Sequence, residues 1–200
     1  GPNKPTHKLL LLANRTDNAA SLSQLRGAKL FFPQGSGGED ISFLWLDTQL
    51  LREGLPLSAE FFKVVKVEDV SKAVLPVFFK RGGVALVTQR AYDNMVELNP
   101  QIGQELTVLR TSPELLFTLS LFRKGYEPSW RREVEETIIK KHLSPEGAQV
   151  LMLFRTSKII PFKEEYIASM RELLAEYQRL KTRRAGKGGA VAAKATHQLP

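Results

Sequence analysis

A glycine-rich loop is the first place in this sequence where residue types and spacing could support chemistry. It lies between a predicted strand and a predicted helix, directly after Gln34, and consists of Gly35, Ser36, Gly37 and Gly38. Unpaired N–H groups at the start of such a helix favour an anion, and a serine hydroxyl adds a donor. The same glycines also suit a tight turn without a ligand. The loop lacks the Gly-Lys-Ser/Thr ending of a nucleotide-binding P-loop, and two acids follow it at once.

Other polar side chains follow predicted strands. Thr88 and Arg90 come after one short apolar run, and Ser112 comes after another. Open α/β sheets bind ligands beyond the carboxyl ends of their strands, but such residues also cap helices and form turns. For these residues, contact with a ligand and a structural role in a cap or turn are therefore alternative interpretations. The predicted ligand site consists of Gln34, Gly35, Ser36, Gly37, Gly38, Thr88, Arg90 and Ser112.

Catalytic and metal-binding patterns are not found. The chain has no cysteine, and its three histidines, His7, His142 and His197, have no carboxylate or second histidine at metal-ligand spacing. We expect these histidines to lie on the solvated surface. The sequence predicts a protein that is not an enzyme and has no catalytic residues, no metal and no cofactor.

The excess positive charge gathers near the end of the chain. The formal net charge is +8, and no acid interrupts the basic series Arg179, Lys181, Arg183, Arg184, Lys187 and Lys194. The preceding part is only slightly basic, so the chain does not present the broad basic surface that nucleic acids require, and we expect no nucleic-acid partner. Residues 182–200 lack aromatic side chains, which predicts a flexible basic tail.

Strand-like and helix-like segments alternate along the first half of the chain. Short apolar runs predict strands over 9–12, 28–32, 61–67 and 84–87, and helical spacing predicts helices over 39–52, 70–79 and 90–98. This alternation predicts an α/β fold with a mostly parallel sheet flanked by helices. After two more apolar runs, the remainder is predicted to be helical, with Ser144 at one helix start and an apolar face over 163–180.

Several short motifs occur in a fixed order. They are Ser-Leu-Ser-Gln-Leu-Arg-Gly-Ala-Lys-Leu-Phe-Phe at 21–32, the serine loop at Ser36, Leu-Arg-Glu-Gly-Leu at 51–55, Phe-Phe-Lys-Val-Val at 61–65, Val-Ser-Lys-Ala-Val at 70–74 with Gly-Gly-Val-Ala-Leu-Val at 82–87, Leu-Thr-Val-Leu-Arg-Thr-Ser-Pro at 106–113, and Leu-Ser-Pro-Glu-Gly at 143–147. As a series, they resemble the periplasmic solute-binding proteins of the phosphate/phosphonate ABC-transporter type. The resemblance spans about residues 9 to 175.

This resemblance implies a type 2 periplasmic-binding-protein fold, whose two lobes close on a small ligand. Family members carry further βα units before the position of Leu9, so the first lobe is expected to be incomplete. A missing N-terminal lobe or another chain would then complete the cleft. The implied organisation is a hinge-entry strand, a central α/β ligand-binding lobe, a hinge return with helices of the partner lobe, and a flexible basic tail, over 1–12, 13–110, 111–181 and 182–200.

The resemblance also implies a function. It is that of a solute receptor for an ABC-type importer, which holds a small polar or anionic ligand between its lobes and contacts an ABC-transporter permease. Such a protein is periplasmic or otherwise extracytoplasmic, although no signal peptide is visible in this sequence.

The sequence departs from the family where members present Ser-Thr-Ser at the helix start and a histidine in the next helix region. Only Ser36 matches, and the stretch 67–70 offers acids in place of the histidine. The alternative is an interaction or sensor domain that keeps the fold but has lost phosphonate binding.

Overall fold

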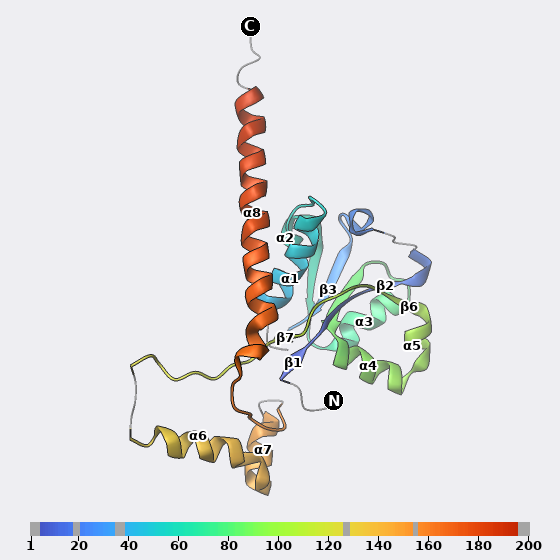
Figure 1. Cartoon of the computed structure of the whole chain (residues 1–200). Helices are drawn as coiled ribbons and strands as arrows, with labels where there is room; N and C mark the ends of the chain where they lie inside the picture. Colours follow the sequence, from blue (N-terminus) through green and yellow to red (C-terminus); the bar gives the residue numbers. More distant parts are fainter. Residues whose placement is uncertain (1–4, 18–20, 35–38, 126–128, 154–155, 196–200) are drawn as a thin grey trace. The chain divides into compact units, whose positions relative to one another are not determined.

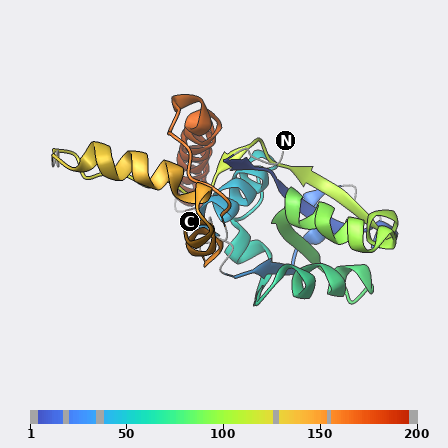
Figure 2. The ribbon, with the colours of Figure 1, turned by 90° about the horizontal axis from the view of Figure 1, so that it is seen from below.

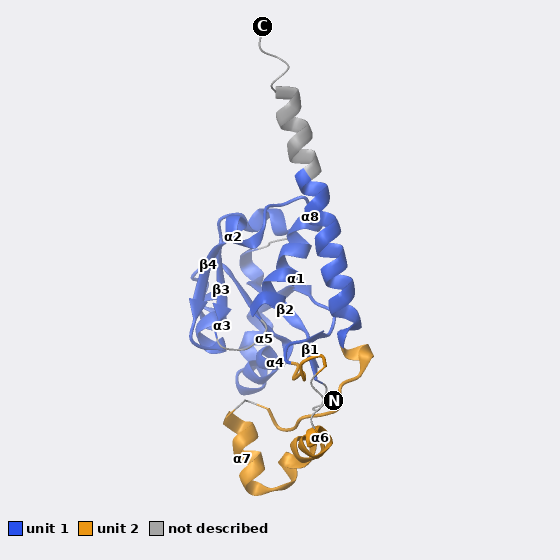
Figure 3. Ribbon diagram, turned by 90° about the vertical axis from the view of Figure 1, so that its left-hand side faces the viewer, with its two compact units in different colours: residues 1–118, 167–200 blue, residues 119–166 orange. Residues whose placement is uncertain are grey.

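The computed structural model describes residues 5–17, 21–34, 39–125, 129–153 and 156–195, with side chains described up to residue 185 (Figure 1). The chain forms two compact units (Figure 3). Unit 1 comprises residues 1–118 and 167–200, and unit 2 comprises residues 119–166.

A five-stranded sheet forms the centre of unit 1. Its order is β4-β3-β5-β2-β6, with bounds β2 Leu9–Asn14, β3 Lys29–Pro33, β4 Lys63–Val67, β5 Val84–Thr88 and β6 Leu106–Thr111. The strand β3 pairs in parallel with β4 and β5, whereas β2 pairs antiparallel with both β5 and β6. Four strands therefore run in one direction and β2 runs against them, which confirms the prediction of a mostly parallel sheet.

Helices cover both faces of this sheet (Figures 1 and 2). One face packs against α1 (Glu39–Arg52) and α8 (Ala168–Ala195), and the other against α3 (Val70–Phe78), α4 (Gln89–Leu98) and α5 (Pro100–Glu105). Consecutive residues of β2 point to opposite faces, so Leu9 and Leu11 join one apolar cluster and Leu10 and Leu12 the other. A strand buried on both faces requires apolar residues at every position, which explains the run of four leucines.

Shorter elements connect these layers. The 3-10 helices η1 (Arg15–Asp17) and η2 (Leu22–Leu25) follow β2, and the short helix α2 (Ser58–Phe61) precedes β4. Gly54 ends α1 in the left-handed region, with φ of 71°. The sequence predicted a strand from residue 61, but the strand begins only at Lys63. Phe61 is the last residue of α2, and its apolar side chain is buried there and not in a strand.

A two-stranded ribbon flanks the sheet within unit 1. The strand β1 (Thr6–His7) pairs antiparallel with β7 (Leu115–Leu116). In the sequence, β1 comes directly before β2, and β7 comes shortly after β6. The Thr6 hydroxyl donates to the Glu114 carboxylate at 2.8 Å. The ribbon therefore joins the segment that precedes β2 to the segment that follows β6.

Unit 2 is helical. It contains α6 (Arg131–Lys140), η3 (Lys141–Leu143) and α7 (Pro145–Leu153), and η4 (Glu164–Ile167) runs from it into unit 1. As predicted, Ser144 starts α7, because its hydroxyl accepts the Gly147 N–H at 3.0 Å.

The end of the chain is helical. The helix α8 continues to Ala195, well beyond residue 182. Its alanine-rich composition suits a helix, because alanine has the highest helix propensity. The flexibility of residues 182–200 and the predicted lobe boundaries at 12, 110 and 181 remain predictions.

Candidate functional site

The predicted site residues that the structure describes lie along one edge of the sheet in unit 1. Because β3, β4, β5 and β6 run in the same direction, their carboxyl ends share this edge, and the amino end of β2 meets them there. Gln34 follows β3, Thr88 ends β5, and Ser112 follows β6. We call this the carboxyl edge. Residues Gly35, Ser36, Gly37 and Gly38 lie outside the described residues.

Arg90 brings a positive charge to the carboxyl edge. It occupies the second position of α4, and its side chain is exposed. Within the described residues, Arg90 forms no ion pair. An arginine whose donors have no protein acceptor can bind an external anion, and the first turn of a helix is a favourable place for one.

Thr88 has a defined structural role. Its hydroxyl accepts the Ala91 N–H at 3.3 Å, which caps the N-terminus of α4. The cap uses an acceptor position of the oxygen and leaves the hydroxyl proton available as a donor. Ligand contact at Thr88 remains a prediction, and the cap holds Arg90 in its place.

Ser112 is buried and joins two strands. Its hydroxyl accepts the Leu9 N–H at 2.8 Å and donates to the Pro113 carbonyl at 2.6 Å. The backbone adds a third link, because the Ser112 N–H donates to the Leu9 carbonyl at 2.9 Å. These bonds support the turn interpretation for Ser112, and ligand contact there remains a prediction.

Gln34 ties the ends of two neighbouring strands together. Its N–H donates to the Val67 carbonyl at 2.7 Å, which fixes the end of β3 against the end of β4, and its side chain is exposed. Three acids near this edge have partners. Glu39 pairs with Lys66, Glu68 pairs with Lys72, and Asp69 accepts the Lys72 N–H at 2.8 Å to cap α3. Much of their negative charge is therefore offset locally.

His7 is a residue of this edge that sequence reasoning missed. It was expected at the solvated surface, but it lies half-buried in β1, with its ring edge-on to Phe117 at 5.6 Å between centroids. Burial is the main cause that lowers the pKa of His7; the charge of Arg90 lowers it further and Glu114 opposes the shift. A two-residue strand gives no periodic signal, so only the pairing of β1 reveals this position. His142, in contrast, is exposed as expected.

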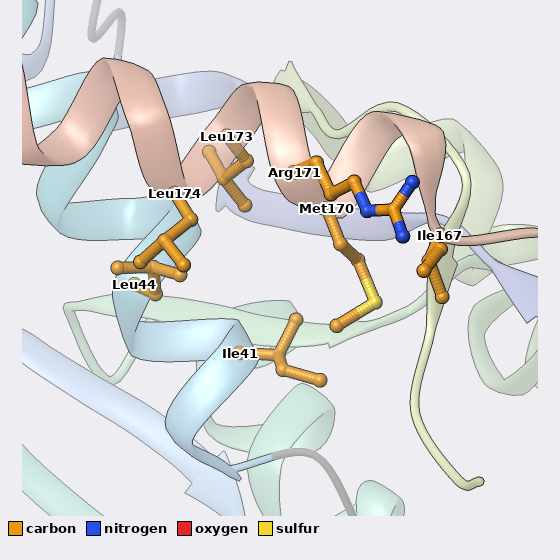
Figure 4. Close-up of a pocket in the computed structure, with 7 residues that line it drawn as sticks. All are labelled: Ile41, Leu44, Ile167, Met170, Arg171, Leu173 and Leu174. Carbon is orange, nitrogen blue, oxygen red and sulfur yellow. The ribbon is translucent and has the colours of Figure 1, made fainter.

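A cavity elsewhere in unit 1 differs in character from the carboxyl edge. A cavity of about 250 Å³ lies between α1 and α8 (Figure 4), lined by Ile41, Leu44, Ile167, Met170, Arg171, Leu173 and Leu174. Apart from Arg171, its lining is apolar, so it lacks the convergent polar groups that orient a polar ligand. It marks where α8 packs on α1.

Metal and membrane sites are not found in the part of the chain that the structure describes. There, no three His, Cys, Asp or Glu side chains gather as metal ligands. Among the same residues, no helix has both the length and the apolar character needed to cross a membrane.

A family model matches residues 2–166, and its description is "ABC transporter, phosphonate, periplasmic substrate-binding protein". The chain belongs to this family. The members of this family are periplasmic, transport-associated binding proteins, and the ligand-binding role expected from the resemblance is confirmed at this level. A search of curated proteins found no significant match.

Solved structures share the fold at low identity. The Xanthomonas citri protein XAC2383 bound to ATP has 18% identity and a TM-score of 0.64, over 88% of this chain and 68% of that structure. A binding protein component of a phosphonate ABC transporter from Pseudomonas aeruginosa has 15% identity and a TM-score of 0.59, over 97% of this chain and 68% of that structure. PhnD1 from Prochlorococcus marinus, in complex with methylphosphonate, has 14% identity and a TM-score of 0.52, over 84% of this chain and 66% of that structure. The chain thus spans about two thirds of these structures, and the type 2 periplasmic-binding-protein fold is confirmed.

Proposed function

We propose that this chain binds a small anionic ligand of the phosphonate or phosphate class at the carboxyl edge, and that it presents this ligand to an ABC-transporter permease outside the cytoplasm. Family membership supports the transport role. The observation that carries the choice of ligand is Arg90, a cation without an ion pair among the described residues, on the first turn of α4.

The surroundings of Arg90 support an anion over a cation. The nearby acids Glu39 and Glu68 are paired with lysines, whereas Arg90 has no ion pair among the described residues and can offer its positive charge to a ligand. The methylphosphonate complex of the Prochlorococcus marinus relative is consistent with this chemistry. Ser36 and its neighbouring glycines remain predicted contacts, because backbone N–H groups after β3 would add donors to those of Arg90.

The proposed role requires no bond making. Binding and release suffice for a receptor, and within the described residues no metal-ligand cluster offers a different chemistry. We therefore propose that the chain is not an enzyme.

Isothermal titration with methylphosphonate, phosphate, phosphite and sulfate tests the proposal. The Arg90→Ala variant should weaken binding of the preferred anion by about tenfold to a hundredfold, because a charge-assisted hydrogen bond contributes about 1.5–3 kcal/mol. Arg81→Ala is the matched control: Arg81 is also exposed and lies before β5, at the opposite end of that strand. It removes the same charge and should leave the affinity unchanged.

Ser36→Ala, measured alongside, tests the glycine loop and should also weaken binding. If none of the four anions binds, or if both arginine variants lose affinity equally, the proposed site is wrong. An equal loss would indicate a general effect of net charge and not a contact at the carboxyl edge.

A further inference from the structure

His7 lies next to Arg90 at the carboxyl edge. Leu9 pairs with Thr88 across β2 and β5, and the Gln89 N–H donates to the Lys8 carbonyl at 2.8 Å. His7 precedes Lys8 and Arg90 follows Gln89, so this bond joins the direct neighbours of the two residues, and the charge of Arg90 acts on the His7 imidazole. His7 belongs to β1 and Arg90 to the first turn of α4, and the pairing of β2 with β5 between these elements brings them together.

The imidazole of His7 has no fixed polar partner in the described part of the chain. Its ring packs edge-on against Phe117, and no hydrogen bond to a described residue involves it. The charged groups that act on it are Arg90, at the start of α4, and Glu114, just before β7. Glu114 already accepts a hydrogen bond from the Thr6 hydroxyl at 2.8 Å. A half-buried imidazole beside a guanidinium without an ion pair is a strong candidate for an anion contact.

We propose that His7 is a second anion-binding side chain of the carboxyl edge, and that ligand binding there is coupled to protonation of its imidazole. The inference rests on the proposed function and adds to the site a residue from the ribbon of β1 and β7. It makes the ligand affinity dependent on pH through the protein.

The charge balance around His7 gives the direction of this coupling. Without a ligand, burial and the neighbouring Arg90 favour the neutral imidazole and lower its pKa. A bound anion between His7 and Arg90 would favour the imidazolium, because an opposite charge at close range stabilises the charged form. The pKa of His7 is therefore higher in the complex than in the free protein, and binding takes up a proton.

The sign of the pH dependence follows from these two pKa values. The contribution of His7 to affinity is fully present below the pKa of the free protein. This contribution is lost as the pH rises from the pKa of His7 in the free protein to its pKa in the complex, and it is absent at higher pH. Ionisation of the ligand adds its own pH dependence, but that part is the same for any variant of the protein.

Calorimetric titration with methylphosphonate at several pH values, in buffers of different ionisation enthalpy, measures both affinity and proton uptake. The wild-type protein should take up more protons on binding than His7→Gln. Its affinity should exceed that of His7→Gln by about tenfold at the acidic end, which corresponds to about 1.4 kcal/mol, and the two should converge at the alkaline end. His142→Gln is the matched control, since His142 is exposed in unit 2 and its ring is hydrogen-bonded to the nearby Ile139 carbonyl. It should behave as the wild type.

A second measurement does not depend on a variant that folds. The imidazole proton of His7, followed by NMR in the wild-type protein, should titrate at a higher pH when methylphosphonate is saturating. Equal proton uptake in wild type and His7→Gln, or an unchanged titration of His7, would overturn the inference while the proposed function stands. Failure of the wild-type protein to bind any of the four anions would overturn both.

Discussion

The two compact units of this chain bury their apolar side chains to very different extents. Among the described residues, Leu151 is the one buried apolar side chain of unit 2, whereas unit 1 buries two large clusters on the faces of its sheet. In unit 2, Leu121, Leu143, Met152 and Leu153 are all more than 70% exposed. The helices of unit 2 therefore depend mainly on local interactions, such as the Ser144 cap and the ion pair between Arg131 and Glu135.

Secondary structure is therefore stabilised mainly by apolar burial in unit 1 and mainly by local interactions in unit 2. Burial of apolar area provides most of the stability of a folded domain, and helices without it are marginal in water. Equivalent residue types should therefore have unequal importance in the two units. Pairs of matched substitutions test this expectation directly.

The largest difference is expected for the two tryptophans. Trp45, on α1, is 1% exposed within the main cluster, and Trp130, in unit 2, is 45% exposed. Trp45→Ala should lower the free energy of unfolding by about 3–5 kcal/mol, because it leaves a large cavity, and Trp130→Ala by less than about 1 kcal/mol. Urea denaturation followed by circular dichroism measures both. Similar losses would mean that unit 2 has a packed core after all.

Two serines provide the next comparison. Ser112→Ala removes the acceptor of the buried Leu9 N–H and should cost about 1–3 kcal/mol. Ser144→Ala removes a helix cap and should cost about 0.5–2 kcal/mol, confined to α7. In hydrogen exchange, the first variant should lose protection across β2 and β6, and the second only in α7. A loss of protection in β2 on substitution of Ser144 would contradict the separation of the units.

The smallest effect is expected from two ion pairs. Arg52 donates two hydrogen bonds of 2.7 Å to Glu176, which joins α1 to α8, while Arg131 donates one of 2.9 Å to Glu135 within α6. Both pairs are accessible to solvent in part, so we expect Glu176→Gln to cost at most about 1 kcal/mol and Glu135→Gln about 0.3–0.5 kcal/mol.

The pH dependence distinguishes the first pair further. The hydrogen bond from Arg52 lowers the pKa of Glu176, so its contribution to stability is present above the ordinary carboxyl pKa of about 4.3 and is lost as the pH falls through the lowered value. Unfolding measured from neutral to acid pH should show the difference between wild type and Glu176→Gln shrinking below that pH. A constant difference would mean that packing of the side chain, and not its charge, joins α8 to α1.

The sequence alone predicted elements whose signals are local. The helical spacing over 39–52 matches α1, Gly54 ends that helix as expected, and Ser144 starts α7. The strands β2, β3 and β5 were found because short apolar runs between turn residues leave few alternatives. The direction of most strands followed from the alternation with helices.

What the sequence could not predict depends on contacts between distant segments. The insertion of β2, antiparallel, between β5 and β6 has no local signal, because a strand buried on both faces reads the same in either direction. The position of His7 beside Arg90 follows from that insertion, and so does the pairing of Leu9 with Ser112. The predicted contacts Thr88 and Ser112 have structural hydrogen bonds that only the pairing of the strands defines.

The central place of β2 also affects how the chain reaches its folded state. The bond between the Leu9 N–H and Ser112 spans 103 positions, and both partners of β2 come later in the chain. Contacts of such high sequence separation slow folding, because a long segment must be closed before they form. During synthesis, the four leucines of β2 leave the ribosome well before β6 exists to cover them. Unit 1 should consequently acquire its complete sheet only after residue 112 has emerged, and until then the apolar strand β2 is exposed to aggregation.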